Sequence, residues 1–160
     1  DPFTLYIAPS HDELAAEGHL YMDDGQTFAY RDDQAFLARK FTLTRDGPGH
    51  LRLASTSLTG RDIHTSASST ALQVPGNAYE QETSSVRVER IIVYGLPEVH
   101  RIIARDAHGH ETSLAFTYTS GTSRSPTASD ASARLASRLE IRDPRVLIGQ
   151  DWSILMEIAP

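Results

Sequence analysis

The chain has 160 residues, a formal net charge of −6 and an apolar fraction of 39%. This length is enough for one domain that buries its own core, and the absence of cysteine excludes a disulfide framework and a thiolate metal site. The acidic balance, without a basic stripe, argues against nucleic acid and against an anionic membrane surface as partners. No apolar run reaches the roughly 18 residues that a transmembrane helix needs.

The first part of the chain predicts short strands separated by turns. Residues 3–8 form an apolar, β-prone run that predicts a strand, and the polar residues 11–18 leave one helical turn and a loop as open alternatives. Further along, residues 35–44 and 51–55 predict two strands on either side of the breaker-rich turn at 45–49.

Between these strands, residues 18–30 have the pattern of a β-hairpin. Residues 20–22 alternate between apolar and polar, and Phe28 and Tyr30 continue the alternation on the expected return strand, where core packing is the default. The predicted structural turn motif consists of Asp23, Asp24 and Gly25. Glycine accepts positive φ and aspartate tolerates it, so this triplet is suited to a tight turn.

The second part of the chain predicts a further set of strands. Residues 86–95 start with strict alternation and end as a continuous apolar run, which is typical of a strand that enters a buried section. Residues 99–105 and 112–119 predict a second hairpin around the turn at 106–109, with alternate apolar residues of 112–119 on one face. Three strand-like segments close the chain: 139–142, 146–148 and 152–158.

Two segments rich in serine and threonine interrupt this pattern. Residues 60–85 and 120–137 hold few large apolar side chains and are expected to be loop insertions. Only a weak strand at 71–74 and a short helix at 129–139 are conceivable in them. Strands at spacings of about 8–12 residues, without any strand–helix–strand rhythm, predict an all-β fold, an antiparallel β-sandwich.

Four pieces of the chain, in order, resemble the C-terminal β-sandwich region of glycoside hydrolase family 31 α-glucosidases. They are "DPFTLYIA" at 1–8, "GHLYMDDGQTFAY" at 18–30 with "ARKFTL" at 38–43, "VERIIVYG" at 88–95, and "DWSI" at 151–154. The chain begins at Asp1-Pro2 without an initiator methionine, so we expect a piece of a longer protein.

The resemblance implies a parent with an N-terminal sandwich, a (β/α)₈ barrel, and proximal and distal C-terminal sandwiches. Residues 1–160 correspond to the distal sandwich, and the resemblance leaves open whether residues 1–31 contribute to the preceding, proximal sandwich instead. The family's two catalytic aspartates lie in the barrel, so the resemblance implies that the parent is a retaining α-glucosidase and that this chain carries no catalytic residue and no cofactor.

The implied role is structural support of the catalytic barrel. The implied parent trims α-1,3-linked glucose from N-glycans in the lumen of the endoplasmic reticulum, binds that substrate elsewhere in its chain, and works with a non-catalytic β subunit. Two alternatives stay open for this segment: a carbohydrate-binding module, and a surface for the regulatory β subunit.

Two groups of polar residues are candidates for a catalytic pair and for a metal site. A retaining glycosidase needs two carboxylates about 5–5.5 Å apart across a sugar, and the neighbours Asp23 and Asp24 in a tight turn cannot flank a bond in that way. His108, His110 and Glu111 suggest a metal site, but the sequence places no further ligand and a solvent-facing hairpin tip is expected. No metal-binding residue is therefore predicted.

Aromatic residues are the remaining candidates for glycan contact. Tyr21, Phe28, Tyr30 and Trp152 would form a sugar-stacking platform if they gathered on one exposed patch. The alternation instead assigns Phe28 and Tyr30 to the core and Tyr21 to the opposite face of its strand, where a domain contact is one use for it.

Overall fold

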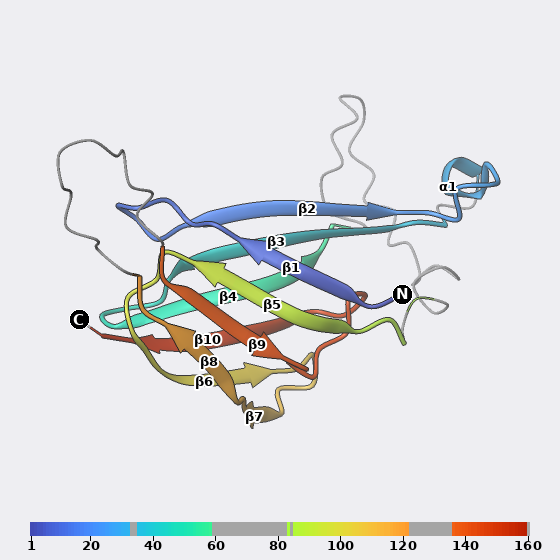
Figure 1. Ribbon diagram of the computed structural model, residues 1–160. Coiled ribbons are helices and arrows are strands. Elements are labelled where there is room, and N and C mark those ends of the chain that lie inside the picture. The colour runs from blue at the N-terminus through green and yellow to red at the C-terminus, as the bar shows by residue number, and fades with distance from the viewer. Residues whose placement is uncertain (33–34, 59–82, 84, 122–135, 160) are drawn as a thin grey trace, which may run out of the picture.

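Two β-sheets face each other across an apolar core (Figure 1). The computed structural model describes residues 1–32, 35–58, 83, 85–121 and 136–159. Its elements are β1 (Phe3–Ile7), β2 (Ala16–Met22), α1 (Ala29–Asp32), β3 (Leu37–Arg45), β4 (His50–Ser57), β5 (Val88–Tyr94), β6 (Val99–Arg105), β7 (Glu111–Ser113), β8 (Phe116–Thr119), β9 (Arg138–Arg142) and β10 (Trp152–Ile158). The expected all-β sandwich is confirmed.

The four-stranded sheet has the order β1-β5-β9-β8, and the six-stranded sheet has the order β2-β3-β4-β10-β6-β7. Every pair of strands is antiparallel except β1 and β5, which run parallel with Leu5 opposite Ile91. A parallel pair needs a long crossover connection, and here β2, β3 and β4 of the other sheet lie between the two strands in the sequence. The four-stranded sheet is therefore mixed and the six-stranded sheet antiparallel.

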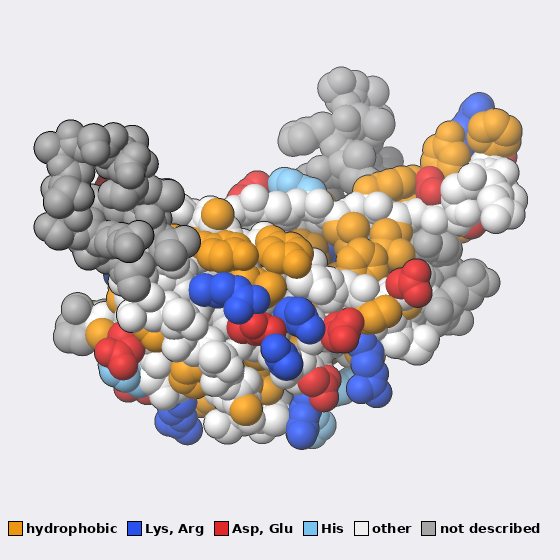
Figure 2. Space-filling view, in the orientation of Figure 1, with side chains coloured by type: hydrophobic (Ala, Val, Ile, Leu, Met, Phe, Trp, Pro, Cys, Tyr) orange, Lys and Arg blue, Asp and Glu red, His pale blue; other side chains and the backbone are white. Residues whose placement is uncertain are grey.

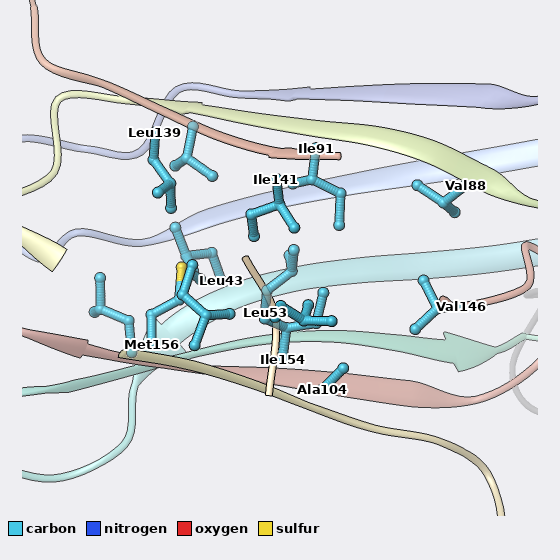
Figure 3. Packing of buried hydrophobic residues seen from close by; sticks show 14 of the residues in the cluster. Leu43, Leu53, Val88, Ile91, Ala104, Leu139, Ile141, Val146, Ile154 and Met156 are labelled. Carbon is cyan, nitrogen blue, oxygen red and sulfur yellow. The ribbon is translucent and has the colours of Figure 1, made fainter. Parts of the chain in front are cut away.

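Alternating side chains explain why the two sheets pack together. In β10 the residues Trp152, Ile154, Met156 and Ile158 are buried while the residues between them are more exposed. Figure 3 shows the core between the sheets, with Leu139, Ile91 and Ile141 from the four-stranded sheet and Leu43, Leu53, Ile154 and Met156 from the six-stranded sheet. Burying such a side chain contributes about 1.5–3 kcal/mol, so this layer is the main source of stability.

Most of the predicted strands are confirmed at or near their expected bounds. Seven strands form where a strand is expected: β1 at 3–8, β3 at 35–44, β4 at 51–55, β5 at 86–95, β6 at 99–105, β9 at 139–142 and β10 at 152–158. Segment 146–148 is different, since Leu147 makes an isolated bridge with Arg87 and no strand forms there.

The hairpin predicted at 18–30 is wrong in its return strand. β2 pairs with β3 so that Met22 lies opposite Leu37, and the connection between them is long and contains α1. Phe28 and Tyr30 lie outside every strand and are 69% and 38% exposed, so the expectation that they pack in the core is also wrong.

Local hydrogen bonds explain this connection. The Asp24 carboxylate accepts the backbone N–H groups of Gln26 and Thr27, and the Thr27 hydroxyl accepts the N–H of Ala29. Such bonds from short polar side chains to the backbone favour the start of a helical turn over a two-residue β-turn. The chain therefore turns through α1 before β3 begins.

The segment expected as one strand at 112–119 is divided between the two sheets. β7 pairs with β6 in the six-stranded sheet, and β8 pairs with β9 in the four-stranded sheet. The chain crosses from one sheet to the other at Leu114, whose N–H donates to the carbonyl of Ile102. Strands that change sheet in this way form the corners of sandwiches, and this one closes one side of the molecule.

The predicted loop insertions, the weak strand and the short helix lie largely outside the residues that the structure describes. Only a few flanking residues of the loop insertions at 60–85 and 120–137 are described, and the weak strand at 71–74 lies wholly outside the described residues. The helix suggested at 129–139 also lies outside them, apart from its end, where Arg138 and Leu139 belong to β9. Within the described residues, no helix has the length and apolar character to span a membrane.

Candidate interaction site at the open side of the sandwich

The predicted turn residues lie on the connection between β2 and α1. The Asp23 carboxylate accepts the N–H of Gly25 at 2.9 Å, and Gly25 has a φ of 63°. Hydrogen bonds from the Thr27 hydroxyl and from the Thr27 and Gln26 backbone hold the pKa of Asp24 below its ordinary value. Both carboxylates therefore bond to their own local backbone.

The residues considered for a metal site lie at the turn between β6 and β7. The Asp106 carboxylate accepts the N–H groups of His108 and His110 and lies 3.1 Å from Nδ1 of His110. Hydrogen bonds from His110 lower the pKa of Asp106, its backbone N–H contributing most. Glu111 pairs with Arg105 instead of turning toward the histidines. Among the residues that the structure describes, no three His, Asp or Glu side chains are grouped for a metal ion.

The four aromatic residues considered for sugar stacking do not form one platform. Trp152 is only 4% exposed, packs against Phe41 with ring centroids 6.0 Å apart, and donates its Nε1–H to the carbonyl of Leu147. The others are exposed: Tyr21 stacks on Phe36, and Phe28 and Tyr30 contact each other near α1. Trp152 therefore belongs to the core.

A groove of about 390 Å³ lies on the side of the sandwich opposite the β7–β8 crossing. It runs between β1 and β2, which are the edge strands of the two sheets. Its apolar lining includes Phe3, Leu5 and Ile7 from β1, Ala16 and Leu20 from β2, and Phe41, Leu43 and Leu53 beneath them. Figure 2 shows hydrophobic side chains gathered along the upper part of this face, where β1 runs in Figure 1. Sequence reasoning identified the strands but not the groove.

Gly18 lies in the middle of β2, opposite Phe41 of β3, and lines the groove. A Cβ atom built on Gly18 would meet no atom within 4 Å. Glycine weakens a strand, and its presence often marks a place where another backbone or a ligand approaches closely. The position therefore leaves open space above the floor of the groove.

The polar groups of the groove are few. Glu17 pairs with Lys40 at 2.8 Å, and this hydrogen bond is the main cause that lowers the pKa of Glu17. His19 lies 3.7 Å from the same carboxylate. In β2, Glu17 and His19 are exposed while their neighbours are half-buried, so the charges lie on the outer face of the strand.

Sequence reasoning also missed a buried arginine near the start of β10. Arg39 is 1% exposed, and its guanidinium donates to the hydroxyl of Ser55 at 2.9 Å, the carbonyl of Gln150 at 2.5 Å and the carboxylate of Asp151 at 2.7 Å. Asp151 also accepts the N–H of Ser57. These bonds tie β3, β4 and the segment before β10 together. The sequence signals were the two motif pieces that hold the partners, Arg39 in 38–43 and Asp151 in 151–154.

A second cluster of charges covers the outer face of the four-stranded sheet. Leu139 and Ile141 point into the core, so Glu140 between them points outward, yet its side chain is only 7% exposed. Arg138 and Arg142 lie 2.7 Å and 2.8 Å from its carboxylate. Figure 2 shows basic side chains gathered around acidic ones on this face. The hydrogen bond from Arg142 and the charges of both arginines lower the pKa of Glu140, although its burial acts in the opposite direction.

This cluster predicts a specific acid sensitivity. Because the folded-state pKa of Glu140 is lowered, its contribution to stability is present above the unfolded value of about 4.3 and is lost as the pH falls through the folded value. We expect the native chain to lose more unfolding free energy than the Glu140→Gln variant between about pH 5 and pH 3, as measured by urea denaturation. Glu157→Gln, an exposed position on β10, is the control and should follow the native profile. Coincident profiles of the native chain and Glu140→Gln would contradict the assignment.

The comparisons with known proteins point in one direction. No family model matches the chain. Neutral alpha-glucosidase AB of Homo sapiens is 26% identical over 154 residues, which cover 96% of this chain and 12% of that protein. Probable glucan 1,3-alpha-glucosidase of Oryza sativa subsp. japonica is 28% identical over 155 residues, and Glucosidase 2 subunit alpha of Schizosaccharomyces pombe is 34% identical over 95 residues.

Solved structures agree with these relatives. A crystal structure of a glucosidase II alpha subunit in its Glc1Man2-bound form superposes with a TM-score of 0.65 and 25% sequence identity, covering 97% of this chain and 14% of that one. The chain thus spans between 12% and 14% of the length of the relatives that it matches over nearly its whole length.

Proposed function

Because the chain is homologous to a segment of the glucosidase II α subunit and neutral α-glucosidase AB, members of glycoside hydrolase family 31, we propose that it is a non-catalytic β-sandwich segment that supports the catalytic barrel of an α-glucosidase. The observation that carries this proposal is the match of 96% of the chain to 12% of a relative. The fold is consistent with such a role, since its residues build a continuous core between two sheets.

The names of the relatives support a proposal about the parent's chemistry. We propose that the parent hydrolyses α-1,3-linked glucose, in line with the relatives named glucan 1,3-alpha-glucosidase. By the same family resemblance we propose N-glycans as the substrate, the lumen of the endoplasmic reticulum as the location and a non-catalytic β subunit as a partner. The substrate would be bound by other parts of the parent.

We also propose that residues 1–160 act as one domain. The pairing of β1 with β5 and of β2 with β3 supports this assignment, because both early strands join sheets that later strands complete. This pairing weighs against giving residues 1–31 to a preceding sandwich.

The structural role predicts the effect of deleting the segment from the complete enzyme. Domain interfaces within a chain bury about 600–1,500 Å², and removal of one exposes apolar surface on the remaining part. We expect a lower yield of soluble enzyme and a midpoint of thermal inactivation lower by roughly 5 °C or more. Turnover of a chromogenic α-glucoside by the residual folded enzyme is the second readout.

The chain alone, without the rest of the parent, is the control and should show no turnover. If the truncated enzyme keeps both its thermal midpoint and its turnover, the structural role is wrong. If the isolated chain hydrolyses the glucoside, the assignment of catalysis to other segments is wrong.

The carbohydrate-binding alternative receives less support. It needs several exposed aromatic rings in one patch, and Trp152 lies in the core while Phe28 and Tyr30 form a pair near α1. The groove offers apolar walls with few polar groups, whereas sugar sites need several converging hydrogen-bonding groups. The structural role therefore stands as the function that the molecule supports best.

A further inference from the structure

β1 and β2 are edge strands of the two sheets, and both lie on the same side of the molecule. β1 pairs with β5 alone and β2 with β3 alone among the strands that the structure describes. Figure 1 shows β2 along the upper side of the sandwich and β1 running obliquely below it, with the groove between them. No strand of the described residues lies across from the outer edge of either strand, and such rows of N–H and C=O groups are templates for pairing with another segment.

β1 lacks the features that usually protect an edge strand. Its sequence, Phe-Thr-Leu-Tyr-Ile, contains no charged residue and no proline, and its one irregularity lies at the start, between Phe3 and Thr4. Edge strands in natural proteins are commonly protected by lysine, proline or bulges along their length. β2 carries one charged residue, Glu17, which pairs with Lys40 of the neighbouring β3, whereas β1 carries none.

The groove between these strands has the size and chemistry for apolar side chains. An apolar cavity of about 150 Å³ holds one benzene ring, so a volume of about 390 Å³ accommodates roughly two large apolar side chains. A β-strand presents every second residue to the same face, about 6.8 Å apart. Two apolar residues at positions i and i+2 of an extended segment therefore match the groove, and the open space above Gly18 lies within it.

We propose that in the complete parent this groove is filled by an extended apolar segment of another domain, which adds to the free edge of β1 as a further strand. The inference rests on the proposed function. Its occupant is taken from the parent because the relatives have more than four-fifths of their length outside the matched segment. Main-chain hydrogen bonds to β1 would give the segment its affinity, and two apolar side chains in the groove would give it its register.

The absence of cysteine from this chain gives a direct test. Gly18→Cys places one thiol in the groove without a clash, because a Cβ there meets nothing within 4 Å. His108→Cys places a thiol at the exposed turn between β6 and β7 and is the matched control. In the isolated chain, iodoacetamide should modify both thiols readily. In the complete parent, the thiol at position 18 should react at least about tenfold more slowly, while the thiol at position 108 keeps its rate.

A second variant tests the same groove by filling it. Gly18→Leu should leave the thermal midpoint of the isolated chain unchanged or raise it, since glycine is unfavourable in a strand interior. In the complete parent the added side chain should compete with the docked segment and lower the thermal midpoint. An unchanged parent would count against the docked segment.

The outcomes separate the two proposals. If deleting the segment destabilises the parent but the thiol at position 18 reacts at its isolated rate, the structural role stands and the docking inference is overturned. If the isolated chain forms a dimer in light scattering in which this thiol is already protected, the groove serves self-association and the inference is again overturned. Protection in the parent together with a monomeric, reactive isolated chain supports it.

Discussion

Replacing Arg39 with alanine is expected to lower the free energy of unfolding by about 3 kcal/mol or more. The change removes the donors to the Ser55 hydroxyl, the Gln150 carbonyl and the Asp151 carboxylate. The Ser55 hydroxyl is buried, and a buried acceptor left without a partner costs about 1–3 kcal/mol. The exposed Asp151 carboxylate can turn to water, so the cavity left by the guanidinium supplies the rest of the loss. Arg39→Lys should recover only part of the stability, because an ammonium group cannot span acceptors as a planar guanidinium does.

Urea denaturation followed by the fluorescence of the single tryptophan, Trp152, measures this effect. Arg45→Ala is the matched control, since Arg45 is an exposed arginine in the same strand and its removal should change the midpoint little. If the two variants unfold at the same urea concentration, the buried bonds of Arg39 do not stabilise the fold.

Replacing Ile154 with alanine is the second change with a large expected effect. Ile154 is 0% exposed and lies in β10, between β4 and β6 in the middle of the six-stranded sheet, where Figure 3 shows it in the core. Removing a buried isoleucine side chain costs about 2–5 kcal/mol, and we expect a value near 3–4 kcal/mol because packing from both sheets prevents collapse of the cavity.

The control lies next to it in the same strand. Leu155→Ala removes a similar volume from a half-buried side chain on the other face of β10, and a loss below about 1.5 kcal/mol is expected. Equal losses in the two variants would mean that the outer face of the six-stranded sheet is as tightly packed as the core.

Periodicity was enough to predict most of the strands. In 152–158 every second residue from Trp152 is apolar, and in 86–95 an alternating start leads into a continuous apolar run; β10 and β5 form there. The same repeat hides the crossing at Leu114, because Leu114 and the β8 residues Phe116 and Tyr118 follow one two-residue repeat and all pack against one shared core, although the chain changes sheet between β7 and β8. Periodicity reports which side a residue faces and does not report which sheet it belongs to.

Other features depend on contacts between distant residues. Alternation along the predicted strand places Arg39 on the same face as Phe41 and Leu43, but no local pattern identifies its partner Asp151, which is 112 residues away in the chain. Phe28 and Tyr30 fit a strand pattern, but the hydrogen bonds of Asp24 favour a helical turn. The groove follows from which strands are terminal in each sheet, and this order is set by tertiary packing.

The parallel pairing of β1 has a consequence for folding during synthesis. Phe3 lies opposite Val88, so the partner of the first strand is made about 85 residues later. At about 5–20 residues per second, β1 waits roughly 4–17 s before β5 emerges, whereas β2, β3 and β4 can pair with one another as each is completed. During that interval an uncharged, apolar strand is exposed near the ribosome, and β1 is therefore the segment of this chain most in need of a chaperone.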